Sequence, residues 1–147
     1  MREIKAGEAG LLYECLEALA EHHNRVSVYF KGQYPQTPSG EKIILFEKEL
    51  EEGITRIAVA ENDTKVVGFC KIGFHDDAGV LEYLVVLEHE RGKGYGAALM
   101  DWALALFREL GVRNIDVKVV FGNDTIRLYE KYGFKPRSTV LRLSTGG

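Results

Sequence analysis

Three glycines at alternate positions, Gly92, Gly94 and Gly96, follow a β-rich apolar run and precede an amphipathic segment. Because glycine has no Cβ, this spacing lets the main chain approach a ligand closely and direct its N–H groups at it. A helix that begins near Gly94 adds a partial positive charge at its N-terminus. With Arg91 and Lys93 beside the turn as mobile cations, the stretch is typical of a site for a diphosphate. The alternative is a tight strand-to-helix connection that only requires small residues.

The same glycines also align with the G-x-G-x-x-A fingerprint of dinucleotide-binding domains, and Asp116 follows about 20 residues later, as the ribose-binding acid would. Two features oppose this interpretation. Five residues separate Val86 from Gly92, whereas the fingerprint turn follows its strand directly. Helices and a hairpin also precede this unit, whereas a dinucleotide-binding domain begins with it. The pattern therefore favours a different diphosphate ligand.

The hydrophobic pattern predicts the elements that must position this turn. Apolar residues recurring at three and four positions predict helices over 8–22, 42–53 and 99–110, and polar capping residues precede a fourth over 123–134. Short β-rich runs predict strands at 2–5, 54–60, 66–74, 80–86, 114–120 and 138–143. Consecutive strands joined by short turns form an antiparallel meander, and the strand, helix, strand order after it forms a parallel unit. We expect an α+β fold with a mixed sheet, in one domain spanning residues 1–147.

Composition and charge narrow the partners. The formal charge of −3 over 147 residues gives no broad basic surface for nucleic acid. No run of about 20 apolar residues and no leader-like start occurs, so we expect no membrane association and a cytoplasmic location. Cys15 and Cys70 have no Cys or His at metal-ligand spacing, which predicts reduced core thiols and no metal site.

Two stretches carry a family resemblance. The sequence LVVLEHERGKGYGAALM, at 84–100, resembles the central motif of the GCN5-related N-acetyltransferases (GNAT), and LYEKYGF, at 128–134, resembles their last helix and its exit. With the order of elements, the resemblance covers nearly the whole chain. It implies the GNAT fold, with a mostly antiparallel sheet of about six to seven strands and about four helices. It also implies direct acetyl transfer from acetyl-CoA to a primary amine, without a metal.

The resemblance implies where acetyl-CoA would bind. The turn from Arg91 to Gly96 would hold the pyrophosphate, and the strand carrying Leu84 and Val86 would splay from its neighbour to pair with the pantetheine arm. The N–H of Leu84 would then point at the thioester carbonyl, where negative charge develops. The full set of coenzyme-binding residues is Leu84, Val85, Val86, Arg91, Gly92, Lys93, Gly94, Tyr95, Gly96, Ala97, Asn123 and Tyr129.

Glu82 is the candidate general base. Deprotonating a lysine-like amine at pH 7 costs about 4.6 kcal/mol and an α-amino group only about 1.4 kcal/mol, so the need for a base depends on the acceptor. The period of two places Glu82 on the face of Leu84 and Val86, and several small-amine members of the family carry a carboxylate there. A solvent-facing carboxylate, or one paired with Arg or Lys, is the alternative. The rival bases are His22, His23, His75 and His89.

Tyr129 matches the family tyrosine that gives the departing thiolate a proton or a hydrogen bond, and Tyr132 is better explained by packing. The family commonly has an asparagine seven residues before that tyrosine. Here Asn123 is six residues before it and Gly122 holds the seventh position. Asn123 would contact the coenzyme if the turn adjusts, or else Asn123 or Asp124 caps the helix.

The acceptor is least defined by the sequence. The resemblance assigns one wall of its site to the first two helices and their connection, where Tyr29, Phe30 and Tyr34 would join Glu82 in binding it. We expect a small-molecule amine, with a peptide amine still open, and a homodimer is an open possibility. The alternative function is a non-catalytic acyl-CoA-binding or sensing domain, which would need neither Glu82 nor Tyr129.

Overall fold

A computed structural model describes residues 1–29, 32–34, 37–119 and 125–145. Its sheet has five strands in the order β1-β2-β3-β4-β5, with the first four antiparallel and β5 parallel to β4. The predicted α+β class with a mixed, mostly antiparallel sheet is therefore confirmed. The strands are β1 (Arg2–Glu3), β2 (Arg56–Asn62), β3 (Lys65–His75), β4 (Ala78–Val86) and β5 (Ile115–Val117).

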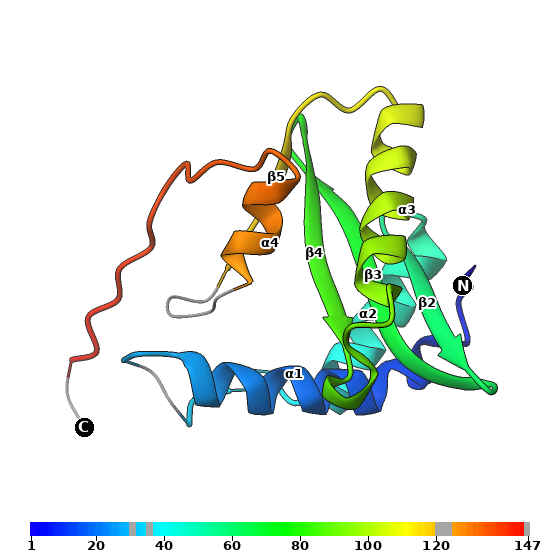
Figure 1. Ribbon diagram of the computed structural model, residues 1–147, viewed down its shortest axis with the longest axis horizontal. Helices are drawn as coiled ribbons and strands as arrows, with labels where there is room; N and C mark the ends of the chain where they lie inside the picture. The colour runs from blue at the N-terminus through cyan, green and yellow to red at the C-terminus, as the bar shows by residue number, and fades with distance from the viewer. Residues whose placement is uncertain (30–31, 35–36, 120–124, 146–147) are drawn as a thin grey trace.

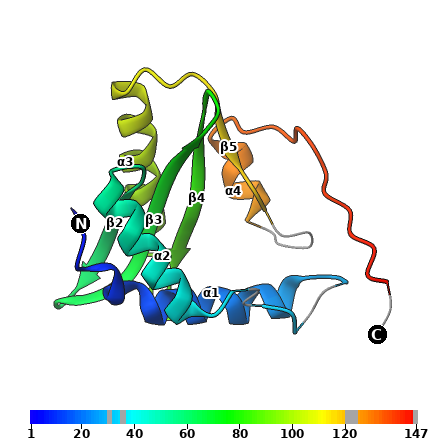
Figure 2. The ribbon, with the colours of Figure 1, turned by 180° about the vertical axis from the view of Figure 1, so that it is seen from behind.

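Helices cover both faces of the sheet (Figures 1 and 2). α2 packs on one face, where Phe46 meets Tyr83 of β4 at 5.4 Å between ring centroids. α3 packs on the other, where Phe107 meets Phe74 of β3 at 6.0 Å. α1 crosses one end of the sheet and α4 lies beside β5. The helical segments are η1 (Ala9–Leu12), α1 (Tyr13–Val26), α2 (Ser39–Glu52), η2 (Glu88–Glu90), α3 (Tyr95–Glu109) and α4 (Ile126–Lys131).

Residues with positive φ lie where α2 ends and where the strands of the meander reverse direction. Gly53 ends α2 in the left-handed conformation at φ +73°, and its N–H bonds the last carbonyls of the helix, as a C-terminal glycine does. Asp63 and Thr64 at the β2–β3 turn and Asp76 at the β3–β4 turn also have positive φ. Aspartate tolerates that region better than most side chains, so Asp63 and Asp76 suit these short connections, whereas the β-branched Thr64 adopts it at a conformational cost.

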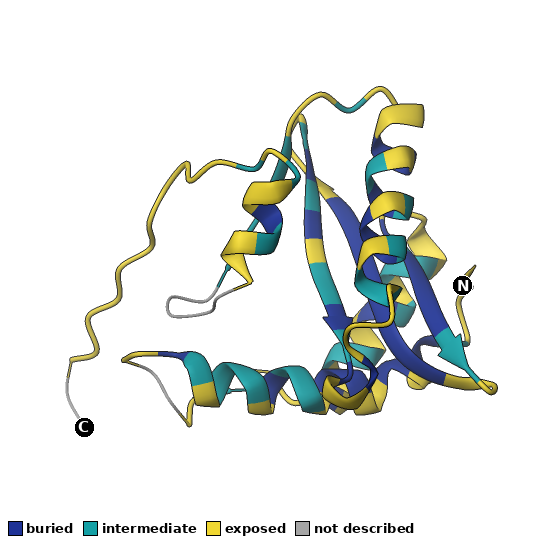
Figure 3. Ribbon diagram, in the orientation of Figure 1, coloured by how far each residue is buried: buried dark blue, intermediate teal, exposed yellow. Residues whose placement is uncertain are grey.

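The core lies between the two helix layers and the sheet (Figure 3). β3 is buried over 66–73, as expected for a strand covered on both faces. Cys15 and Cys70 are free thiols with no exposed surface, and burial raises the pKa of each to about 12. The prediction of free, reduced thiols in the core is confirmed.

The predicted last strand is wrong. Residues 138–143 carry no strand, and Val140, Leu141 and Leu143 are 78%, 89% and 86% exposed. A strand needs a neighbour that takes up its main-chain hydrogen bonds, and the described residues of this chain supply none there. The sheet therefore has five strands rather than six to seven. The strand predicted over 114–120 is also shorter, because β5 spans only Ile115–Val117.

No helix in the described part of the chain is both long and apolar enough to cross a membrane.

Candidate functional site

β4 extends past the end of β5. All three residues of β5 pair with β4, from Ile115 beside Gly79 to Val117 beside Leu81, and the rest of β4 continues without β5 as a neighbour (Figure 1). A cavity of about 300 Å³ opens there, lined by Val80, Leu81, Glu82, Tyr83 and Lys118. This end of β4 therefore has a neighbour on one edge only, within the residues that the structure describes.

The free edge of β4 presents the main chain of Leu84 and Val86. The N–H of Leu87 bonds the carbonyl of Val67 on the β3 side at 2.8 Å. Since neighbouring residues of an antiparallel strand point their polar groups to opposite edges, Leu84 and Val86 point away from β3. The Val86 carbonyl accepts a hydrogen bond from Arg91 Nε at 3.3 Å. Among the described residues, no strand pairs with this edge of β4 past Leu81, and the pairing of Leu84 and Val86 with a pantetheine arm stays a prediction.

A β-bulge changes the orientation expected for Glu82. Lys71 pairs with Tyr83 and Ile72 with Leu81, so Glu82 is an extra residue without a partner on β3. Two consecutive side chains of β4 then lie on the same face of the sheet. Tyr83 packs against Phe46 of α2, and Glu82 bonds Lys71, which is the β3 residue paired with Tyr83. The prediction that Glu82 shares the face of Leu84 was wrong, because a bulge breaks the period of two.

Lys71 is a buried cation between two carboxylates. Its side chain is 2% exposed, with the Nζ atom 3.2 Å from Glu49 Oε1 and in direct contact with Glu82. The same atom lies 4.6 Å from the centre of the Phe46 ring. Burial lowers the pKa of Lys71, and Glu49 opposes that effect. The contact with Lys71 supports the alternative that Glu82 is an ion-paired carboxylate, while its place on the cavity wall suits a role toward substrate. The general-base assignment stays a prediction.

We expect Lys71→Met to lower the free energy of unfolding by about 3 kcal/mol at pH 7, because it leaves two part-buried carboxylates without their cation. Urea denaturation measures the change. In the triple variant that adds Glu49→Gln and Glu82→Gln, most of the stability should return, since the uncompensated charges are then gone. A loss below about 1 kcal/mol in the single variant would mean that water or another group already neutralises the pair.

The glycine turn leads into an uncapped helix. Gly92 and Gly94 have φ of +80° and +90°, and a Cβ at either position would meet open space. Gly94 is the N-cap of α3 and supplies no side-chain bond to the helix, while its carbonyl accepts from Ala98 N–H. The first N–H groups of α3, from Tyr95 to Ala97, have no partner within the helix, because the helical ladder starts one turn later. An anion could accept hydrogen bonds from these groups, and the anion site at this helix start stays a prediction.

Lys93 is not the mobile cation that the sequence suggested. Its Nζ lies 3.0 Å from Glu90 Oε2, and this contact raises the pKa of Lys93. Glu90 is 8% exposed and accepts a weaker bond from Asn62. A lysine three residues after a buried carboxylate is drawn to it, so Arg91 is the more available cation beside the turn.

Tyr129 is a buried phenol on α4. The residue is 8% exposed and its ring lies 5.7 Å from that of Phe134. Burial first, and the charge of Cys70 second, raise the pKa of Tyr129 to about 12. Asn123, the other coenzyme contact assigned to this region, lies outside the described residues.

The residues predicted to bind the acceptor have different surroundings. Tyr29 is 77% exposed, and Phe30 lies outside the described residues. Tyr34 is held by Asn24, whose side chain bonds both its N–H and its carbonyl, and its ring meets His23 at 5.0 Å. Burial lowers the pKa of His23 to about 4, which leaves it neutral at pH 7.

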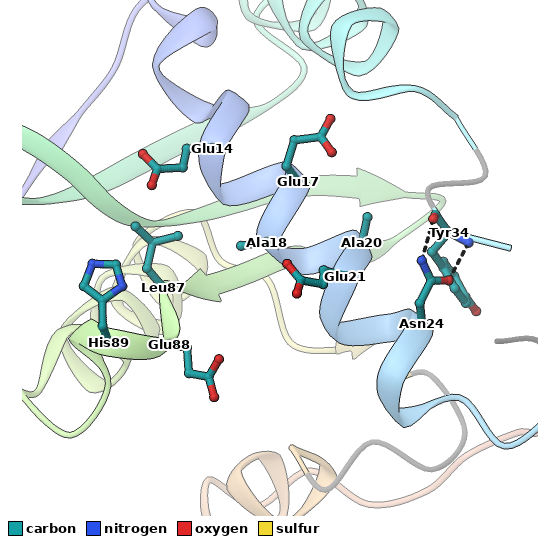
Figure 4. A pocket seen from close by; sticks show the side chains of 10 residues that line it. All are labelled: Glu14, Glu17, Ala18, Ala20, Glu21, Asn24, Tyr34, Leu87, Glu88 and His89. Carbon is teal, nitrogen blue, oxygen red and sulfur yellow. Dashed lines mark hydrogen bonds between the residues drawn. The ribbon is translucent and has the colours of Figure 1, made fainter. Parts of the chain in front are cut away.

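Tyr34 borders a second cavity of about 520 Å³ between α1 and the segment after β4 (Figure 4). Its remaining lining residues are Glu14, Glu17, Ala18, Ala20, Glu21, Asn24, Leu87, Glu88 and His89. The sequence analysis did not predict the acidic lining of this cavity. The spacing of Glu14, Glu17 and Glu21, at i, i+3 and i+7, would have placed all three on one helix face. None of the histidines proposed as rival bases lines the cavity at Glu82.

Among the described residues, no three or more His, Cys, Asp or Glu side chains are grouped as the ligands of a metal ion would be.

Comparisons with known proteins agree with this geometry. A sequence model of the acetyltransferase (GNAT) domain matches residues 53–136, while the curated protein sequences contain no match. Three solved structures have the same fold. The first, a predicted acetyltransferase with acetyl-CoA from Clostridium acetobutylicum, is 17% identical, covers 97% of this chain and 94% of its own, and has a TM-score of 0.74.

The second is the PaiA N-acetyltransferase of Thermoplasma acidophilum in complex with coenzyme A, at 16% identity, 95% and 94% coverage and a TM-score of 0.77. The third is a GCN5-related N-acetyltransferase of Ralstonia eutropha JMP134, at 18% identity, 99% and 97% coverage and a TM-score of 0.76. The fold is that of an acetyltransferase (GNAT) domain. The chain belongs to the GCN5-related N-acetyltransferase family.

Proposed function

We propose that the protein is an acetyl-CoA-dependent N-acetyltransferase that transfers the acetyl group directly to a primary amine of a small molecule. The observation that carries this proposal is one continuous line of main-chain groups. It runs from the free edge at Leu84 and Val86, through Gly92 and Gly94, to the uncapped start of α3. An extended arm that ends in a diphosphate has the shape and the acceptor groups that such a line would bind.

The residues of this line would divide the work of binding and catalysis. The N–H groups at the start of α3 and the Arg91 guanidinium would bind the pyrophosphate, and the main chain of Val86 would pair with the arm. The Leu84 N–H would stabilise the negative charge on the thioester oxygen, since a fixed donor in a dry site stabilises charge better than water does. Tyr129 would donate a hydrogen bond to the leaving sulfur.

The pKa of Tyr129 restricts how it could act. With a pKa near 12 against about 8.5 for an ordinary thiol, full proton transfer to the thiolate would be uphill by about 5 kcal/mol. A hydrogen bond to the thiolate carries no such cost. We therefore assign Tyr129 the stabilisation of developing charge on sulfur, which is the hydrogen-bonding version of the role that its motif implies.

Two acidic regions support an amine acceptor. Glu82 lines the cavity where β4 and β5 separate, close to the end of the proposed acyl arm at Leu84. The larger cavity beside α1 is bordered by four glutamates, Glu14, Glu17, Glu21 and Glu88. Carboxylates attract a protonated amine to the site, and the two cavities are too small to accept a folded protein surface.

A thermal-shift panel with acetyl-CoA, coenzyme A and NAD tests the donor, followed by mass spectrometry of a primary-amine mixture for added acetyl groups. A ligand at 100 times its dissociation constant stabilises by about 2.7 kcal/mol, which raises the melting temperature by about 5–10 °C. We expect such shifts with acetyl-CoA and coenzyme A, and acetylation of at least one amine. A shift with NAD alone would refute the donor, and acetyl-CoA binding without transfer to any amine would favour the sensing domain.

A further inference from the structure

The carboxylate of Glu82 is held against β3. Lys71 contacts one of its oxygens, Oε2. The other oxygen lies over Gly73, where a Cβ would overlap Oε1 and would lie 3.1 Å from Cδ. Any larger residue at position 73 would therefore displace the carboxylate. The Glu82 side chain is 28% exposed, so the held carboxylate still borders the cavity between β4 and Lys118.

The cation of this cluster is enclosed by α2. Glu49 Oε1 lies 3.2 Å from Lys71 Nζ, and the centre of the Phe46 ring lies 4.6 Å from the same atom. Burial lowers the pKa of Lys71, and the charge of Glu49 opposes that effect by stabilising the ammonium. With Glu82, the buried cation has two carboxylates beside it. The ionised cluster therefore carries one negative charge in excess.

The excess charge matters when a proton arrives. A carboxylate that takes the proton of an ammonium becomes neutral. If Lys71 had Glu82 as its one partner, this step would leave a buried cation unpaired, which is costly. With Glu49 beside it, Lys71 stays paired and the cluster passes from one excess negative charge to neutrality. A cluster that only fastened α2 to the sheet would need a single ion pair and no excess carboxylate.

We propose that Lys71 and Glu49 are positioning residues that prepare Glu82 to act as the general base. Lys71 fixes the carboxylate over Gly73, and Glu49 keeps Lys71 paired while Glu82 holds the proton. In this step an N–H bond of the acceptor ammonium breaks and an O–H bond forms on Glu82, while the electron pair stays on nitrogen for attack on the thioester. The inference rests on the proposed acetyl transfer, and it gives roles to two residues outside the motifs that carry the resemblance.

Further titratable groups border the cluster. Lys118 lines the cavity beside Glu82. Lys42 of α2 has its Nζ atom 5.6 Å from the centre of the Tyr83 ring. Burial first, and the charge of Glu49 second, raise the pKa of Tyr83, which keeps its hydroxyl neutral at pH 7. These groups are the same in both of the charge variants described next, so they cannot produce shifts of opposite sign.

An NMR titration of isotope-labelled glutamate carboxyls tests the arrangement in the free protein, with the Glu82 signal identified by its absence in Glu82→Gln. An opposite charge at about 4–6 Å lowers the pH at which a carboxyl ionises by about 1–3 units, so Lys71→Met should raise the Glu82 midpoint by about 1 unit or more. Glu49→Gln should lower the midpoint, because a negative neighbour is lost while the cation remains. The acid limb of kcat/KM should move in the same two directions, since Glu82 must be ionised to accept a proton.

Gly73→Ala is a second test that changes no charge. Gly73 is not among the glycines with positive φ, so alanine suits its backbone. The added methyl group should push the carboxylate away from Lys71 and raise the Glu82 midpoint. It should also lower kcat/KM by about tenfold or more, a part of the roughly 10²–10⁴-fold that a positioned base contributes. The matched control is Glu52→Gln, which removes an exposed carboxylate from the end of α2 and should change neither value.

Glu82 midpoints that stay unchanged in both charge variants, or that move in the same direction, would overturn the proposal. Shifted midpoints with an unshifted limb of kcat/KM would do so too, and would leave the cluster as a structural link between α2 and the sheet. Failure of the proposed function would look different. The wild-type protein would then acetylate no amine and Glu82 would not be a base, while the midpoints would still move in opposite directions.

Discussion

Replacing Gly94 by valine should weaken acetyl-CoA binding by about 100-fold or more, as measured by isothermal titration. Gly94 has φ +90° with open space around its missing Cβ, and it is the residue from which α3 starts. A branched side chain there would cover the N–H groups of the first turn and strain the backbone that aims them. Hydrogen bonds to charged groups contribute about 1.5–3 kcal/mol each, so losing one or two accounts for this effect.

Gly111 offers a matched control for the strain. It lies beyond the other end of α3 at φ +75°, also with nothing near its missing Cβ. Gly111→Val should therefore carry a similar conformational cost, about 1–2 kcal/mol, and leave acetyl-CoA affinity unchanged. If both variants lost affinity equally, general destabilisation would explain the result, and the glycine turn would not be the diphosphate site.

Local patterns predicted the parts of the site that depend on local geometry. The glycine spacing indicated a close-approach turn, and Gly92 and Gly94 both have positive φ. The meander and the helices follow from hydrophobic periodicity, because each element buries one stripe against a neighbour close in sequence. The resemblance supplied the splay of β4, which composition and periodicity did not show, and the register confirms that pairing with β5 ends at Leu81.

The corrected features depend on contacts between distant residues. The bulge that turns Glu82 toward Lys71 arises from the register of β3 against β4, and no local pattern marks the extra residue. Glu49 reaches the same cation from α2. The 138–143 run has the composition of a strand, but composition does not provide a neighbour. The sequence therefore predicted its propensity and not its state in a single chain.

Tyr129→Phe should lower the turnover number by about 100-fold, the range for a lost hydrogen-bond donor to developing charge, while acetyl-CoA affinity stays within about twofold. The phenol is buried on α4, and the variant keeps the aromatic ring, so it removes a donor and changes the packing little. Steady-state kinetics with the amine found in the acceptor screen, and titration with acetyl-CoA, give the two values.

Because burial raises the pKa of Tyr129 to about 12, its hydroxyl stays protonated below that value. Wild-type turnover should therefore not fall between pH 8 and 10 through loss of this proton.

Tyr132→Phe is the control for this variant, since Tyr132 ends the same helix and packs against the core only partly buried. It should keep full turnover. Unchanged turnover in Tyr129→Phe would remove the hydroxyl from the mechanism and leave Tyr129 as a core residue. Equal losses in both variants would indicate a disturbed α4 rather than a missing donor. A loss of turnover in Tyr129→Phe alone, with acetyl-CoA still bound, distinguishes a catalytic domain from a sensing domain. A domain that only binds acyl-CoA does not need a hydrogen bond to the departing sulfur.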